Sequence, residues 1–123
     1  MANDIQTIIS RYIDAWNETD PGQRQAIVAE VFSEHASYTD PLASVRGRPA
    51  IDQFIAGAQT QSAGLRISLA GGVDAHHEQA RFGWHLLAPG QTDPVAIGFD
   101  VVALDGDQIG AVYGFLDKVP SVT

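Results

Sequence analysis

Three polar side chains stand in apolar surroundings, and together they have the groups that a proton-transfer site needs. Tyr12 falls on an apolar stripe with helical spacing, Asp40 follows a second helical pattern, and Asp100 interrupts an apolar run. Burial without a cation raises the pKa of a carboxyl group, which can then stay protonated and donate a hydrogen bond, and a buried tyrosine hydroxyl also seeks a partner. Two donors beside one ionised carboxylate can remove a proton next to a carbonyl group and stabilise the resulting oxyanion.

Each of the three residues also has a structural explanation. Asp40 precedes Pro41, and Asp before Pro commonly opens a turn. Tyr12 is compatible with a core tyrosine whose hydroxyl bonds to the backbone. A bulge could turn Asp100 to solvent or to Arg81 on a neighbouring strand. The functional interpretation requires all three side chains to meet at one place.

Helical spacing of apolar residues predicts three helices that position these groups. The first runs from about residue 4 to 17 and turns Tyr12 inward. The second begins after the N-cap Asp20, which is followed by a proline, and its apolar face ends with Phe32. The third spans residues 47 to about 62, and a brief extended segment followed by a loop precedes it.

Beyond residue 64 the apolar pattern takes the two-residue period of strands. We expect strands over residues 66–75, 80–86, 95–104 and 108–117, with a bulge near Gly71 and Gly72. Three helices before a mostly antiparallel sheet make an α+β fold. A chain of 123 residues is long enough for one core, so we expect residues 1–123 to form a single domain.

The expected strand over residues 95–104 is apolar on both faces apart from Asp100. Helices can cover only one face of such a sheet, so we expect a homodimer that packs through the other face. The alternative is a single chain with an exposed apolar patch. Periodicity does not decide which face Asp100 shares, because a bulge reverses the phase.

Composition excludes several classes of partner. The formal net charge is -8 and the few basic residues are scattered, so we expect no nucleic-acid partner and no anionic membrane partner. No apolar stretch is long enough to span a bilayer, and the chain does not start like an export signal. These features predict a cytoplasmic protein.

Metal and cofactor sites have no support in the sequence. The absence of cysteine excludes disulfides, thiolate ligands and a cysteine nucleophile. The 4 histidines lack the spacing of a metal site, although His85 could join a pocket. Glycine-rich phosphate loops are also missing. We therefore expect neither a metal ion nor a cofactor.

Several segments together resemble the SnoaL-like branch of the nuclear transport factor 2-like (NTF2-like) superfamily, which includes the bacterial ketosteroid isomerases. The resemblance covers nearly the whole chain and implies a cone of helices and curved sheet around a deep apolar pocket, commonly as a sheet-mediated dimer. The segments that carry it are Arg11-Tyr12-Ile13, Tyr38-Thr39-Asp40-Pro41, Gly47-Arg48, Phe99-Asp100-Val101-Val102-Ala103-Leu104-Asp105-Gly106 and Gly114-Phe115-Leu116-Asp117.

The resemblance also implies roles for the three polar residues. Tyr12 matches the oxyanion-hole tyrosine of the isomerases, Asp40 their general base and Asp100 their protonated, hydrogen-bond-donating aspartic acid. This chain has Phe32 and Ile55 where some isomerases have supporting tyrosines, so the hydrogen-bond network behind Tyr12 is expected to be thinner.

The leading hypothesis is a cofactor-independent proton-transfer enzyme, isomerase-like or cyclase-like, that acts on a small hydrophobic carbonyl compound. The alternative is a non-catalytic module that binds a small apolar ligand. A third interpretation, epoxide hydrolysis, requires an Asp and Arg pair in the pocket, with Arg81 beside Asp100 as its sign. The side chains expected to contact the ligand are Trp16, Phe32, Phe54, Ile55, Phe82, Trp84 and Phe115.

Overall fold

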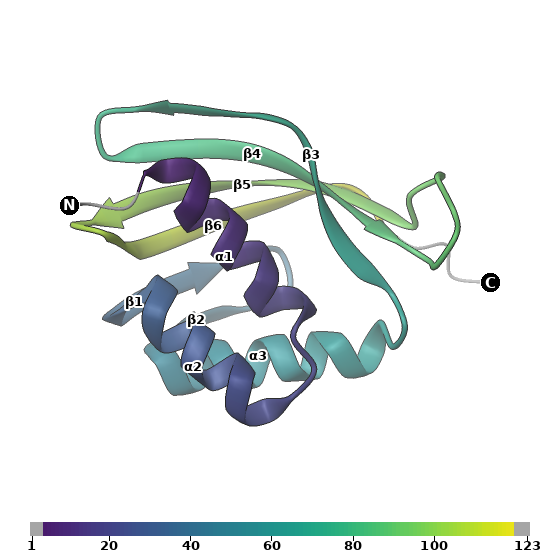
Figure 1. The fold of residues 1–123 in the computed structure, drawn as a ribbon, viewed down its shortest axis with the longest axis horizontal. Coiled ribbons are helices and arrows are strands. Elements are labelled where there is room, and N and C mark those ends of the chain that lie inside the picture. The colour runs from purple at the N-terminus through teal and green to yellow at the C-terminus, as the bar shows by residue number, and fades with distance from the viewer. Residues whose placement is uncertain (1–3, 120–123) are drawn as a thin grey trace.

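Three helices lie on one side of a curved six-stranded sheet in the computed structural model, which describes residues 4–119 (Figure 1). The architecture is the predicted α+β fold. In chain order its elements are α1 (Ile5–Asn17), α2 (Pro21–Val31), β1 (Phe32–Thr39), β2 (Ser44–Arg46), α3 (Arg48–Gln61), β3 (Arg66–His76), β4 (Gln79–Leu87), β5 (Ala96–Asp105) and β6 (Gln108–Lys118).

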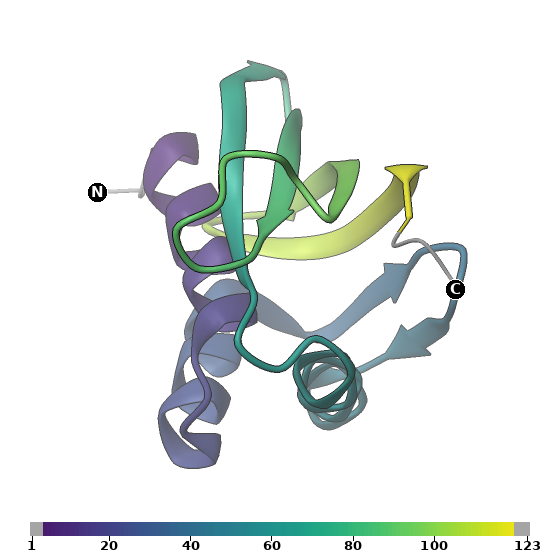
Figure 2. The ribbon, with the colours of Figure 1, turned by 90° about the vertical axis from the view of Figure 1, so that its right-hand side faces the viewer.

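The sheet has the strand order β2-β1-β6-β5-β4-β3. Neighbouring strands are antiparallel except β1 and β6, which run parallel. A shift of register between Ala70 and Asp74 confirms the predicted bulge in β3, where Gly71 has a φ of 78° that favours glycine. Viewed after a quarter turn, the sheet bends around the helices without closing on itself (Figure 2).

The second helix is one residue shorter than predicted. Phe32 leaves the helical conformation at φ -100 and ψ 142 and begins β1. Its ring is fully buried and packs edge-on against Tyr12 at a centroid distance of 5.9 Å. A position four residues after Val28 fits a helical stripe, but the strand buries the ring equally well, so spacing alone does not separate the two. The placement of Phe32 on the helix is therefore wrong.

The first two strands differ most from the prediction. β1 is longer than the expected extended segment, and Ser44–Arg46 forms β2 where a loop was expected. β2 pairs antiparallel with β1, with Ser37 opposite Arg46. Three residues provide too few alternating positions for a periodic signal, so only the pairing defines this strand. The turn of the hairpin carries Asp40.

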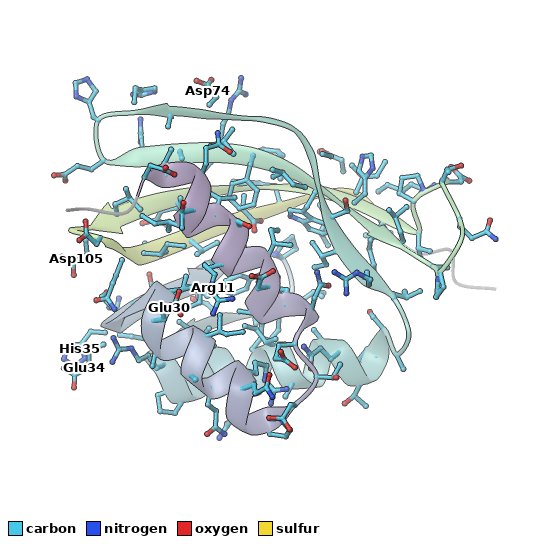
Figure 3. The ribbon with its side chains drawn as sticks, viewed as in Figure 1. Arg11, Glu30, Glu34, His35, Asp74 and Asp105 are labelled. Atoms are coloured by element: carbon cyan, nitrogen blue, oxygen red, sulfur yellow. The ribbon has the colours of Figure 1, made fainter. Side chains whose placement is uncertain are left out.

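Two charged contacts hold the helices together. Arg11 on α1 and Glu30 on α2 point toward one another, with guanidinium-to-carboxylate distances of 3.0 and 3.1 Å (Figure 3). Arg24 on α2 is buried and donates to Asp52 on α3 at 2.8 Å. Removing one partner of a buried pair leaves an uncompensated charge, so this contact keeps α2 against α3.

β5 separates two environments. Alternate residues from Ala96 to Val102 are buried on the inner face, beneath the helices, and the residues between them are half-buried on the outer face. Asp100 belongs to the inner face and is only 4% exposed. The inner face therefore carries the carboxylate whose orientation periodicity left open.

No helix within residues 4–119 has the length and apolar character needed to cross a membrane.

Candidate active site

The helices and the inner face of the sheet enclose a cavity of about 400 Å³. Tyr12 from α1, Asp40 from the β1–β2 turn and Asp100 from β5 all line it. Tyr12 and Asp100 are nearly inaccessible to solvent, with 1% and 4% of their surface exposed. The fold thus brings the three predicted polar residues from distant segments to one cavity.

Asp100 accepts a hydrogen bond on each carboxylate oxygen. The Tyr12 hydroxyl donates to Oδ2 at 2.8 Å, and the Trp84 indole N–H donates to Oδ1 at 3.2 Å. Burial raises the pKa of Asp100 to about 6, the two hydrogen bonds oppose that rise, and the nearby charge of Asp40 adds to it. Asp100 can therefore change its protonation state close to neutral pH.

Arg81 does not reach the cavity. It lies opposite Val101, an outward-facing residue of β5, and its guanidinium donates to Asp74 at 3.3 Å on the surface. Figure 3 shows Asp74 at the outer edge of the sheet, on β3. The explanations that turn Asp100 to solvent or to Arg81 are therefore wrong.

Trp84 reaches Asp100 because Gly98 has no side chain. Trp84 and Gly98 are opposite one another in β4 and β5. A Cβ atom on Gly98 would lie 2.3 Å from an indole carbon of Trp84 and 2.5 Å from the carbonyl oxygen of Phe115. The indole ring occupies this space, and its N–H extends to the next inward residue of β5.

Gly114 lies between the two carboxylates. It pairs with Asp100 across β5 and β6. A Cβ atom on Gly114 would lie 3.0 Å from Oδ1 of Asp100 and 3.2 Å from Cβ of Asp40. Both acids therefore border one small space on β6, which explains why the charge of Asp40 contributes to the raised pKa of Asp100.

Asp40 is fixed by three hydrogen bonds. Its Oδ1 accepts from the backbone N–H groups of Leu42 and Ala43, at 2.8 and 3.0 Å, and its Oδ2 accepts from the Tyr38 hydroxyl at 2.7 Å. Asp40 therefore does organise a turn, as the Asp-Pro sequence suggests. The same side chain also lines the cavity, so the structural and functional interpretations are compatible.

Neither nearby arginine neutralises Asp40. Arg46 donates to the carbonyl oxygen of His35 at 3.1 Å, and Arg48 donates to the carbonyl oxygen of Phe32 at 2.9 Å. These bonds fasten β2 and the start of α3 to β1. Asp40 is consequently free of the ion pair that would prevent it from acting as a base.

Tyr38 lines the cavity, although no site role was predicted for it from the sequence. Burial, followed by the charge of Asp100, raises the pKa of both Tyr12 and Tyr38 well above the usual tyrosine value. Both hydroxyls therefore remain protonated donors. Tyr38 precedes Asp40 by two residues at the end of a strand, and this spacing, which places side chains on one face, was the available signal.

Six of the seven residues predicted to contact the ligand divide into two groups. Trp16, Phe54 and Trp84 line the cavity. Phe32, Ile55 and Phe82 are fully buried in the core, and the two phenylalanine rings pack edge-on against Tyr12 at 5.9 and 5.7 Å. Phe32 and Phe82 thus hold the ring of Tyr12 in place, and none of the three residues lines the cavity.

Phe115 lies on the other side of the sheet. It is 50% exposed and stacks on Phe99 at a centroid distance of 5.0 Å, whereas its neighbour Leu116 lines the cavity. The prediction that Phe115 contacts a ligand in the cavity is therefore wrong, because alternation along β6 turns it outward.

Within residues 4–119, no group of three His, Cys, Asp or Glu side chains is placed to hold a metal ion.

Comparison with known proteins gives one decisive similarity. No protein-family model and no curated protein sequence matches the chain. A crystal structure from Agrobacterium tumefaciens, described as that of a candidate isomerase of the SnoaL-like family, is 40% identical. The match covers 91% of this chain and 96% of that one, with a TM-score of 0.86. The chain belongs to the SnoaL-like family.

More distant structures share the fold of this SnoaL-like protein. A candidate ketosteroid isomerase from Kribbella flavida is 15% identical, with a TM-score of 0.69 and coverage of 95% of this chain and 80% of that one. A candidate polyketide cyclase from Sinorhizobium meliloti is 17% identical, with a TM-score of 0.69 and coverage of 88% and 93%. At these identities the likeness concerns the NTF2-like fold alone.

Proposed function

We propose that this SnoaL-like protein is a cofactor-independent enzyme that transfers a proton on a small hydrophobic carbonyl compound, as an isomerase or a cyclase does. The observation that carries the proposal is the convergence of Asp40, Tyr12 and Asp100 on one largely apolar cavity. The 2.8 Å hydrogen bond between Tyr12 and Asp100 joins the two groups proposed to hold the substrate oxygen.

In the proposed reaction Asp40 is the general base. Its carboxylate removes a proton from the carbon next to the carbonyl group, and the electrons of the broken C–H bond form an enolate. The carboxylic acid then returns the proton to the same carbon or to a conjugated carbon, which restores the carboxylate. The three hydrogen bonds from Tyr38, Leu42 and Ala43 keep the carboxylate in place during this cycle.

Tyr12 and Asp100 are the proposed donors to the enolate oxygen. Because the pKa of Asp100 is raised to about 6, proton uptake near neutral pH turns it from an acceptor into a donor. Protonation also weakens its hold on the Tyr12 hydroxyl, which can then donate to the same oxygen. Binding of a carbonyl oxygen is therefore coupled to protonation of Asp100.

The cavity would also serve a non-catalytic module that binds a small apolar ligand, and this is the alternative that an experiment has to exclude. Epoxide hydrolysis is not favoured. Its expected sign was Arg81 beside Asp100, and Arg81 instead binds Asp74 on the surface.

Hydrogen exchange tests the role of Asp40. Exchange of the α-hydrogens of 1-tetralone in heavy water, followed by proton NMR, should be accelerated by the native protein. The Asp40→Asn variant should lower the accelerated rate by about 100-fold or more, because an amide is a very poor base. The matched control is Asp107→Asn, which removes one exposed carboxylate from the β5–β6 turn and should leave the rate unchanged.

Binding measurements separate catalysis from ligand storage. Equilenin, a planar phenol, can be titrated through the fluorescence of the 2 tryptophans, since both line the cavity. Binding of equilenin and of 1-tetralone without accelerated exchange would contradict the enzyme and support the binding module. An equal loss of exchange in Asp40→Asn and Asp107→Asn would contradict the role of Asp40.

A further inference from the structure

Within residues 4–119, two carboxylates and no cationic side chain line the cavity. All 7 Lys and Arg residues of the chain lie within residues 4–119, and none of them lines the cavity, nor does any histidine. Among the described residues, the groups that donate to Asp40 and Asp100 are all uncharged: hydroxyl, indole and backbone N–H groups. Buried charge without a counter-ion is costly, so these acids favour a positively charged occupant of the cavity.

Three aromatic rings from three elements form a wall of the same cavity. Trp16, Tyr38 and Phe54 contact one another with centroid distances of 5.7, 6.1 and 5.3 Å. Their planes are inclined to one another by 48°, 86° and 38°, so they form a corner and not a parallel stack. Aromatic rings set at angles are the surface on which proteins hold quaternary ammonium groups.

We propose that the cavity binds a hydrophobic organic cation, an ammonium group with apolar substituents, between the Asp40 and Asp100 carboxylates and this aromatic corner. The carboxylates supply the opposite charge, and the rings supply cation–π contact and apolar surface. A small hydrated metal ion would gain nothing from the rings, and a neutral apolar ligand would gain nothing from the acids. The inference rests on the proposed function only in using the same cavity, and it requires no proton transfer.

Affinity for a cation should depend on pH in the opposite direction to affinity for a carbonyl compound. The groups that face Asp100 are Tyr12 from α1, Trp84 from β4, and Asp40 and Tyr38 from the β1 side. Both tyrosines stay neutral, since their pKa values are raised. Affinity for a cation should rise as pH increases through about 6, where Asp100 ionises, whereas affinity for a carbonyl oxygen should fall.

A pair of probes with the same shape tests the charge directly. Benzyltrimethylammonium and neopentylbenzene differ in one atom, a charged nitrogen in place of carbon. Titration of the native protein at pH 7.5, measured by tryptophan fluorescence and calorimetry, should give at least about 10-fold tighter binding of the cation. This comparison needs no variant, so it does not depend on any substituted chain being able to fold.

Variants then locate the binding energy. Asp100→Asn should weaken binding of the cation by about 10-fold and leave binding of neopentylbenzene unchanged, while Asp107→Asn should change neither. Phe54→Leu removes one ring but keeps an apolar side chain, and it should weaken binding of the cation more than binding of the neutral probe. Thermal unfolding shows whether each variant is folded. If Asp100→Asn does not fold, the comparison of the two probes is made with Phe54→Leu instead.

Equal affinity for the two probes, or cation affinity that falls as pH rises through 6, would overturn the inference. Its failure is distinguishable from failure of the proposed function. If the cation does not bind but 1-tetralone exchanges with dependence on Asp40, only the cation inference falls. If the cation binds and 1-tetralone neither binds nor exchanges, the inference stands and the proposed proton transfer on a neutral carbonyl compound falls.

Discussion

The inner and outer faces of β5 and β6 are built from alternate residues of the same strands, yet they are opposite in character. Two inward positions are glycines, Gly98 and Gly114, and a third is Asp100. The outward positions include Tyr113 and Phe115, which are 48% and 50% exposed. The strands therefore omit side chains on the inner face, beside Trp84 and the two acids, and place large apolar side chains where no helix of residues 4–119 covers the sheet.

The space that the inner glycines leave is filled in two different ways. The indole ring of Trp84 occupies the space above Gly98, and the two carboxylates border the space at Gly114. On the outer face Phe99 and Phe115 stack on each other, and removing either ring would create no enclosed void. The inner face should therefore be sensitive to added atoms, and the outer face should tolerate the loss of atoms.

Gly98→Ala should have the largest effect on the inner face. The new methyl group would lie 2.3 Å from Trp84 and 2.5 Å from a backbone oxygen, and the backbone cannot yield as a flexible side chain can. We expect the free energy of unfolding to fall by about 3 kcal/mol, the upper part of the range for overpacking. The displaced Trp84 should also lose its hydrogen bond to Asp100. Urea unfolding measures the first effect, and the fluorescence of Trp84 reports the second.

Gly57→Ala is the matched control, since nothing lies within 4 Å of the methyl group that it adds to α3. Alanine is the better helix former, so this variant should gain about 0.5–1 kcal/mol. Equal stability of Gly98→Ala and Gly57→Ala would show that the inner face has room for a methyl group at Gly98.

Asp100→Asn should have the next largest effect. It should remove a pH dependence of the free energy of unfolding that the native chain shows between pH 4 and 6. The pKa of Asp100 is about 6 in the folded chain and 3.8 in its ordinary state, so the folded chain holds the proton more tightly. A raised carboxyl pKa means that stability falls as pH rises through this window, by about 2 kcal/mol between pH 4 and 6. The difference between native and Asp100→Asn unfolding curves at pH 4, 5 and 6 measures this slope. A difference that stays constant with pH would contradict the raised pKa.

Periodicity predicted the elements whose apolar faces are long enough to repeat. The structure confirms α1, α3 and the four long strands. Their apolar stripes are visible in the sequence because the same residues pack in the core, as those of α1 do. The inward orientation of Tyr12 followed from the same stripe and is confirmed by its burial. The apolar surroundings of Asp40, Tyr12 and Asp100 suggested that they form one site, and the family resemblance assigned their roles; spacing alone did not predict that they meet.

Register and short elements could not be predicted in this way. Contact of Trp84 with Asp100 depends on Trp84 lying opposite Gly98, and no local pattern specifies which residues of two strands pair. Phe115 was placed in the cavity because it is aromatic, although its neighbour Leu116 has the inward phase. Tyr38 differs from these cases, because its place in the cavity depends on one strand only. It lies two residues before Asp40, and alternate residues of an extended chain share a face.

The outer face gives the prediction with the smallest effect on the cavity. We propose that two copies of the chain pack through this face, because aromatic side chains such as Tyr113 and Phe115 are half-exposed there. Replacing both with serine should raise the dissociation constant of the homodimer by about 10-fold or more, measured by size-exclusion chromatography with light scattering. Binding of the cavity probes should be unchanged, because neither residue lines the cavity. A native chain that is monomeric would contradict the dimer, and altered probe binding in the double variant would show that the two faces are coupled through the strands they share.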